Sequence, residues 1–218
     1  MRHQLREFAD DAALARAAAA FVAQRAVEAV AAKGSFAFAV SGGRTPWAMF
    51  AELASGHMPW PETIIFQVDE RVAPDGDDSR NLTNLVRSLG AARPTIKPMP
   101  VNDANLDLAA DQYAALLPER FDLVHLGLGP DGHTASLVPG DPVLDVSDRL
   151  VALTSPYQGQ RRMTMTYPAL ARADQVLWLI TGADKREPLA QLVAGDTSIP
   201  AGRVEAGRSL ILADKAAT

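Results

Sequence analysis

Short runs of apolar residues alternate along the chain with segments in which apolar positions recur at helical spacing. A continuous apolar run is typical of a strand buried on both faces, and helical spacing predicts a helix that packs on a sheet. Strands are predicted over residues 36–40, 63–68, 121–126, 150–153, 161–166, 175–181 and 209–212, with a weaker one near Ile96. Helices are predicted over residues 9–33, 47–53, 84–89, 106–117, 168–171 and 183–193.

This alternation predicts a layered α/β fold, in which helices flank a doubly wound, mostly parallel sheet. The length of 218 residues suits one such domain, and no internal repeat or linker divides the chain. We therefore expect a single α/β domain over residues 1–218.

Composition narrows the classes of function. Hydrophobic residues make up 48% of the chain and charged residues 22%, as in ordinary globular proteins. The net charge of −5 argues against a broad surface for nucleic acid or anionic membranes, and the absence of cysteine excludes disulfides and a thiol nucleophile. No apolar run reaches the ~18 residues that span a bilayer. Residues 1–10 lack the apolar core of a secretory signal, so we expect a soluble, cytoplasmic protein.

The most distinctive segment, residues 121–137, joins a predicted buried strand to a turn with three glycines and a proline. Glycines permit sharp turns and close approach, and open α/β sheets build their sites at the carboxyl ends of strands. His133 follows the turn, and Thr134 and Ser136 are small polar residues suited to beginning a helix. A strand–turn–helix unit that presents His133 is therefore predicted.

A second glycine loop follows the strand over residues 36–40 and reads Ser41, Gly42, Gly43, Arg44, Thr45 and Pro46. Thr45 as the cap and Pro46 as the first helical residue predict a helix start. Free backbone N–H groups between a strand and a helix can hold an anion. A plain strand-to-helix turn is the alternative, and the two glycines alone do not decide between them.

Charged residues also collect near the ends of the other predicted strands, namely Asp69, Glu70, Arg71, Asp131, Arg162 and Lys185. Three consecutive charges after an apolar strand are not expected in a core, so residues 69–71 form either a solvated loop or the lining of a cleft. Several cations, a glycine loop and a histidine suit a small phosphorylated substrate, because Arg binds phosphate through two donors and Lys adds a point charge.

Each of these residues has an ordinary alternative. Arg71 could form a surface ion pair with Asp69 or Glu70, which would contribute little to stability. Lys185 could point into solvent, as most lysines do, and His133 could only cap a helix. The combination at four strand ends favours a site.

Several known chemistries lack their motifs. The chain has no nucleotide P-loop and no Gly-x-Ser-x-Gly element of a serine hydrolase. Gly127, Gly129 and Gly132 match Gly-x-Gly-x-x-Gly, but they come late in the chain and no acidic residue follows at the distance expected for a dinucleotide site. The four histidines show no metal-ligand spacing, so no catalytic metal is expected.

Several motifs occur together and in order: Ser41 to Pro46, Asp69-Glu70-Arg71 with Ser79 and Asn81, Gly127 to Leu137, Arg162 to Thr166, and Gly182 with Lys185. With these motifs the chain resembles the 6-phosphogluconolactonases, which are related in fold to the glucosamine-6-phosphate deaminases. The resemblance runs from about Ala9 to Leu212. Arg44 stands where many relatives carry a small residue, Val138 replaces a usual Phe, and Arg80 splits a typical Ser-Asn pair.

The resemblance implies a Rossmann-type α/β fold and hydrolysis of 6-phospho-D-glucono-1,5-lactone to 6-phospho-D-gluconate in the pentose phosphate pathway. No cofactor, nucleic acid or membrane is implied, and we expect a monomer or a weak homodimer. His133 would be the general base, since an imidazole with a reference pKa of about 6.5 suits that role at cellular pH.

The remaining site residues are assigned less finely. Asp131 or Asp69 would orient the His133 ring. The groups expected to bind the 6-phosphate or to stabilise the oxyanion are Ser41, Gly42, Gly43, Arg71, Arg162 and Lys185. Arg44 is also expected among the residues that bind the substrate phosphate, and it could alter how the phosphate is held. The sequence does not divide these two tasks among the cations.

Two rival hypotheses remain. The first is a deaminase or isomerase of the same fold, although Thr134 to Leu137 and the Asp-Glu-Arg motif favour the lactonase. The second is a catalytically silent sugar-phosphate-binding module of a regulator. The acidic chain leaves no room for a DNA-binding region, and the intact His133 favours an enzyme.

Overall fold

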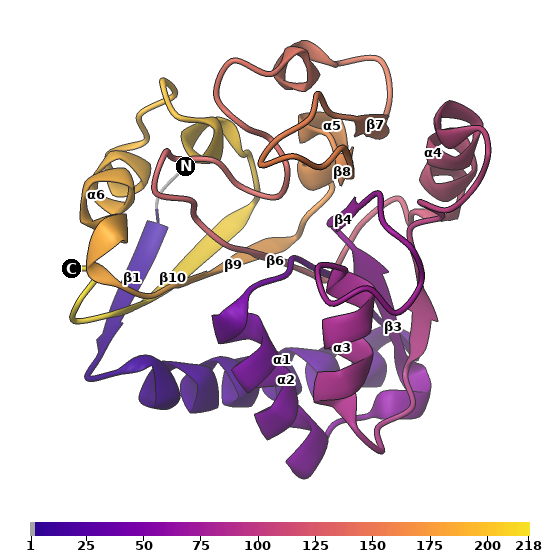
Figure 1. Ribbon diagram of the computed structural model, residues 1–218. Coiled ribbons are helices and arrows are strands. Elements are labelled where there is room, and N and C mark those ends of the chain that lie inside the picture. The colour runs from indigo at the N-terminus through magenta and orange to yellow at the C-terminus, as the bar shows by residue number, and fades with distance from the viewer. Residues whose placement is uncertain (1–2) are drawn as a thin grey trace.

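Seven parallel strands form the central sheet of the protein, as described by a computed structural model for residues 3–218 (Figure 1). In spatial order the strands are β1 (His3–Phe8), β10 (Arg208–Asp214), β9 (Gln175–Ile180), β6 (Leu123–Leu126), β2 (Phe36–Val40), β3 (Thr63–Gln67) and β5 (Thr95–Lys97). From β2 the chain builds the sheet toward β5, whereas from β6 it builds toward β10. The order of strands therefore reverses between β2 and β6.

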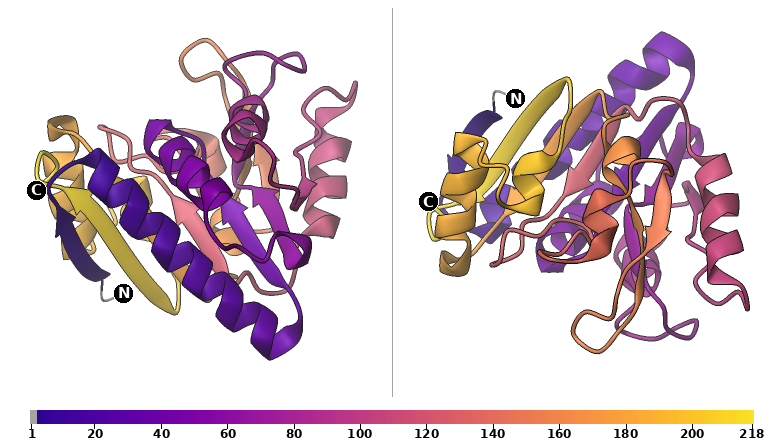
Figure 2. Two further views of the ribbon diagram at one scale, coloured as in Figure 1. Left: turned by 90° about the horizontal axis from the view of Figure 1, so that it is seen from below. Right: turned by 90° about the horizontal axis from the view of Figure 1, so that it is seen from above.

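Two layers cover the sheet (Figures 1 and 2). One face carries α1 (Asp11–Lys33), α2 (Arg44–Ser55) and α3 (Asn81–Leu89). The other carries α4 (Leu106–Leu116), α5 (Tyr167–Leu170), α6 (Arg186–Ala194) and a small antiparallel sheet of β4 (Asp69–Arg71), β8 (Arg162–Met165) and β7 (Val151–Leu153). No helix within residues 3–218 is long and apolar enough to cross a membrane.

Strand β2 illustrates why the sheet is buried on both sides. Phe36, Phe38 and Val40 point into the core formed with α1, α2 and α3, whereas Ala37 and Ala39 point into the core on the other face. All five residues are buried. Side chains alternate between the faces of a strand, so a run of only apolar residues fits a strand with a helical layer on each side.

The predicted doubly wound, mostly parallel α/β fold is confirmed. The apolar pattern did not predict β1, because His3–Phe8 is largely polar and exposed and pairs only with β10 at the edge of the sheet. It also did not predict the small antiparallel sheet. The predicted domain of residues 1–218 includes Met1 and Arg2, which lie outside the described residues.

Two predicted helix starts are wrong. Helix α2 begins at Arg44 with Gly43 as its cap, and the Thr45 hydroxyl instead lies 2.9 Å from that of Thr181. No helix begins at Thr134 or Ser136. Thr134 donates to the Gly127 carbonyl at 2.9 Å, and Ser136 donates to a carboxylate at 2.7 Å. Tertiary partners therefore use the hydroxyls that a helix cap would need.

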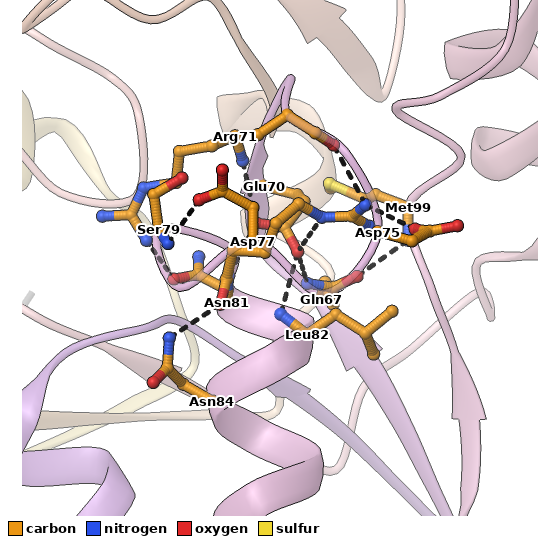
Figure 3. Close-up of polar contacts among 12 residues, drawn as sticks. Gln67, Glu70, Arg71, Asp75, Asp77, Ser79, Asn81, Leu82, Asn84 and Met99 are labelled. Atoms are coloured by element: carbon orange, nitrogen blue, oxygen red, sulfur yellow. Dashed lines mark hydrogen bonds and ion pairs between the residues drawn. The ribbon is translucent and has the colours of Figure 1, made fainter.

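The expectation that residues 69–71 lie outside the core is wrong for Glu70, whose side chain is fully buried and makes polar contacts drawn in Figure 3. Its carboxylate accepts from the backbone N–H groups of Asn81 and Leu82, at 2.7 and 2.8 Å, where α3 begins. Arg80 Nε lies 3.2 Å from the same carboxylate, and Arg80 also donates to Asp75 at 2.7 Å. The cost of burying this carboxylate is offset by the helix N-terminus and by the buried cation.

We expect Glu70→Ala to lower the free energy of unfolding by about 3–5 kcal/mol, because it leaves Arg80 buried without this partner. Urea denaturation measures the loss. The matched control is Asp78→Ala, which removes an ion pair with Arg87 in which both side chains are mostly exposed, with an expected change below about 1 kcal/mol. Equal effects of the two substitutions would contradict the structural role of Glu70.

Candidate active site

The candidate site lies where the strand order reverses. Strands β2 and β6 are neighbours there, with Val40 paired in register to His125. Ser41 to Gly43 follow β2, and Gly127 to His133 follow β6, so both loops leave the same edge of the sheet. The predicted meeting of these two loops is therefore present in the structure.

A pocket of about 190 Å³ opens at this edge. Seven of the predicted site residues line it, namely Ser41, Gly42, Asp69, Arg71, His133, Arg162 and Lys185. Gly43 and Arg44 instead line a neighbouring pocket of about 380 Å³, which shares Arg71, Asn81 and Arg162 with the first. Asp131 lines neither pocket but contacts His133.

His133, which lines the pocket, forms a hydrogen-bonded pair with Asp131. His133 Nδ1 lies 2.5 Å from Asp131 Oδ1. Partial burial acts to raise the pKa of Asp131, but the charge and hydrogen bonds of His133 outweigh it and leave that pKa below its usual value. An ionised carboxylate only accepts, so Nδ1 carries a proton, and in the neutral ring Nε2 then has the lone pair. The geometry suits a general base at Nε2.

Asp69, the other candidate for orienting the ring, has different partners. One of its oxygens accepts from the Ser136 hydroxyl at 2.7 Å, and the other accepts from the Asn81 amide at 3.2 Å. The side chain is buried and faces the pocket. Of the two candidates, Asp131 is the one that contacts His133.

Two glycines are required by close approach of side chains. A Cβ on Gly129 would lie 2.0 Å from His133 Nδ1, and a Cβ on Gly42 would lie 1.8 Å from Asn81 Oδ1. Both distances are far shorter than any van der Waals contact. The glycines therefore make room for the His133 ring and for the amide that holds Arg71.

Arg71 and Arg162 lie directly opposite each other in the antiparallel pair of β4 and β8. Like charges in that position repel. Burial lowers the pKa of Arg162, and the charge of Arg71 lowers it further. Among residues 3–218 neither arginine forms an ion pair, so the alternative that Arg71 pairs with Asp69 or Glu70 is wrong. Arg71 instead donates to Asn81.

Lys185 lines the same pocket from the segment that follows β9. It lies in the short 3-10 helix Ala183–Lys185, directly before α6, and its side chain is only 18% exposed. It forms an ion pair of 2.8 Å with Asp184, a mostly exposed residue. Lys185 is therefore not simply a solvent-facing lysine, because it lines the pocket as well.

Two polar groups at the pocket have no hydrogen-bond partner among residues 3–218, although both are buried. They are the Ser41 hydroxyl and the Arg162 Nε group. Burying a donor without a partner costs roughly 1–3 kcal/mol, which a bound anion would offset. His125 lies behind Ser41 and its Nδ1 accepts from the Ser41 N–H at 3.3 Å. Burial lowers the pKa of His125 to about 3, so the ring is neutral there.

Sequence reasoning gave no individual contact at the candidate site to Asn81 or Tyr157. Asn81 appeared only as part of a motif, but it contacts both Arg71 and Asp69. Tyr157 was missed altogether, because it lies in a polar loop without a periodic pattern. Its hydroxyl donates to Asp131 at 3.3 Å. Only the approach of distant loops in space identifies these residues.

The fold and site define a class of protein. Residues 9–212 match the family described as glucosamine-6-phosphate isomerases/6-phosphogluconolactonase, so the chain belongs to that family. Among curated relatives it is 35% identical to a 6-phosphogluconolactonase of Nostoc, over 85% of this chain and 84% of the relative. It is also 40% identical to the human GDH/6PGL endoplasmic bifunctional protein, over 74% of this chain but only 23% of that longer protein.

Solved structures agree with these relatives. The 6-phosphogluconolactonase of Thermotoga maritima superposes with a TM-score of 0.89 at 26% identity, covering 98% of this chain and all of that one. A monomeric glucosamine-6-phosphate deaminase superposes with a TM-score of 0.86 at 18% identity, covering 100% of this chain and 98% of that one. That likeness shows the fold alone. The predicted resemblance to the 6-phosphogluconolactonases is confirmed.

Proposed function

We propose that the protein hydrolyses 6-phospho-D-glucono-1,5-lactone to 6-phospho-D-gluconate in the oxidative pentose phosphate pathway, with His133 as the general base. The observation that carries the proposal is one pocket lined by both the His133 ring and the cation pair of Arg71 and Arg162. The first suits ester chemistry and the second suits a phosphate. The lactonase relatives support this substrate over that of the deaminases.

A lactone is an ester, and its hydrolysis needs little more than a positioned water and a base. In the proposed reaction, His133 Nε2 takes a proton as the water oxygen bonds to the carbonyl carbon C1. The bond between C1 and the ring oxygen then breaks, and His133 returns the proton to that oxygen. Asp131 holds the ring and stabilises the protonated imidazole between the two steps.

In this scheme the position of each cation decides whether it binds the phosphate or stabilises the oxyanion. Arg71 and Arg162 come from β4 and β8, and no protein carboxylate within residues 3–218 forms an ion pair with either. A phosphate dianion would relieve their repulsion and satisfy the free Arg162 Nε. We assign the 6-phosphate to this pair together with Ser41. Lys185, whose ion-pair partner Asp184 is mostly exposed, is assigned to the negative charge that develops on the carbonyl oxygen.

The rival functions have less support. The likeness to a deaminase is at a sequence identity that shows only the fold. Nothing in the described residues favours a silent regulatory module over an enzyme. The expected cytoplasmic location, the monomer or weak homodimer, and the absence of a cofactor and of nucleic-acid binding stay predictions.

The test of the proposed function is the rate of lactone opening by the purified protein. The lactone is generated in the assay from glucose 6-phosphate, and its loss is followed against the spontaneous rate. We expect acceleration with and without EDTA, and no release of ammonia from glucosamine 6-phosphate. Ammonia release without lactone opening would overturn the lactonase proposal in favour of the deaminase.

A further inference from the structure

Tyr157 lies beside the His133–Asp131 pair, in the loop between β7 and β8. Its hydroxyl donates to Asp131 Oδ2 at 3.3 Å. Its ring meets the His133 ring edge-on, with centroids 5.6 Å apart and an angle of 67° between the planes. The guanidinium of Arg162 lies over the same ring, 5.0 Å from its centroid. One side chain thus contacts the His133–Asp131 pair and one arginine of the cation pair.

The loop that carries Tyr157 is held in place by its own hydrogen bonds. Tyr157 and Gln160 exchange two backbone hydrogen bonds of 3.0 and 3.2 Å, which close the turn. Gln160 then donates from its side chain to the Ser79 hydroxyl at 3.1 Å. That bond joins the loop to the segment before α3, and both views of Figure 2 show the two loops side by side. Hydrogen bonds within the loop and to a neighbouring segment therefore fix the position of Tyr157.

Tyr157 completes the hydrogen bonding of Asp131. One carboxylate oxygen accepts from His133 and the other accepts from Tyr157. The terminal torsion of an aspartate is broad, so a carboxylate held at one oxygen can still rotate. A second donor fixes its plane. Burial and the nearby Asp131 charge raise the pKa of Tyr157, so the phenol stays protonated and able to donate.

We propose that Tyr157 is a positioning residue, which fixes Asp131 and thereby the His133 ring through its hydroxyl and supports Arg162 through its ring. The inference rests on the proposed function, since it concerns the same site. Its two parts are separable, because the hydroxyl donates to Asp131 whereas the ring face contacts Arg162.

Tyr157→Phe removes the hydroxyl and keeps the ring. We expect kcat for the phosphorylated lactone to fall roughly three- to tenfold with little change in KM, as for loss of one hydrogen bond. The acid limb of the pH profile of kcat/KM should also move to higher pH. Without the phenol donor, one hydrogen bond to the Asp131 carboxylate is lost. The negative charge of Asp131 then attracts the proton on His133 more strongly.

Tyr157→Leu also removes the ring face. We expect KM to rise in addition, because Arg162 loses the surface that supports it. The matched control is Tyr167→Phe. Tyr167 likewise donates to one acceptor, the Pro200 carbonyl at 3.0 Å, and carries Arg203 over its ring at 4.8 Å, but it lines neither of the two site pockets. Its kinetics should match those of the unsubstituted protein.

A readout without substrate separates this inference from the proposed function. The ring resonances of His133, followed by NMR against pH, should change at a higher pH in Tyr157→Phe than in the unsubstituted protein. This shift supports the role of Tyr157 even for a protein that opens no lactone. Coincident titration curves, or equal kinetic effects of Tyr157→Phe and Tyr167→Phe, would overturn it.

Discussion

Replacement of His133 by alanine is expected to lower kcat for lactone hydrolysis by roughly 100- to 10,000-fold, the usual contribution of a general base. The reason is geometric. Asp131 binds Nδ1, so Nε2 is the nitrogen left to take a proton from water, and within residues 3–218 no second histidine lines the pocket. The lactone also opens spontaneously, so the rate must be measured well above that background.

The control for this prediction is His57→Ala. His57 is exposed and lies just after α2, so its loss should leave the rate unchanged. The unfolding midpoints of both variants should stay close to that of the unsubstituted protein. If His133→Ala retains the full rate with a normal unfolding midpoint, His133 is not the base, whatever the substrate is.

Replacement of Arg71 by alanine is expected to raise KM for the phosphorylated lactone by roughly 10- to 100-fold, as for loss of charge-assisted hydrogen bonds. Unphosphorylated gluconolactone should be hardly affected, because it has no group for this cation. The ratio of the two KM changes is the measurement. Lys185→Ala serves as the comparison. A role at the carbonyl oxygen predicts that this substitution lowers kcat for both the phosphorylated and the unphosphorylated lactone.

The cation pair also makes a prediction about stability that a purely structural role would not. Arg71 and Arg162 face each other across two strands, and within residues 3–218 neither forms an ion pair, although the charge of Asp69 acts favourably on Arg162. Removing one charge should therefore leave the free energy of unfolding unchanged or slightly raised in the absence of ligand. An exposed arginine such as Arg87 is the control for substitution itself. A large loss of stability in Arg71→Ala, with equal KM changes for both lactones, would contradict a phosphate-binding role.

The buried strands show how much of the fold could be predicted from the sequence. Residues 36–40 and 175–180 are apolar at almost every position, and a strand of that kind needs a helical layer on each face. The helices between them follow from spacing and from glycines such as Gly34, which ends α1 in a left-handed conformation. Strand β1 could not be predicted, because a largely polar edge strand carries no such apolar pattern.

The site could be predicted from the sequence in part. Loops after parallel strands must meet at one edge of the sheet, so Ser41 and His133 could be placed together from their positions alone. The choice between Asp131 and Asp69 could not be made, since both follow strands at that edge. It depends on a contact of 2.5 Å within one turn and on a serine that binds the other carboxylate.

The sequence by itself determined the class of fold, the edge of the sheet at which chemistry collects, and the histidine that a glycine turn presents there. These follow from local periodicity and from the direction of parallel strands. Only the tertiary structure decided that Arg71 faces Arg162, that Glu70 is buried with Arg80, and that Tyr157 reaches Asp131. Those contacts join segments far apart in the chain, and the packing that brings the segments together leaves no periodic trace in either one.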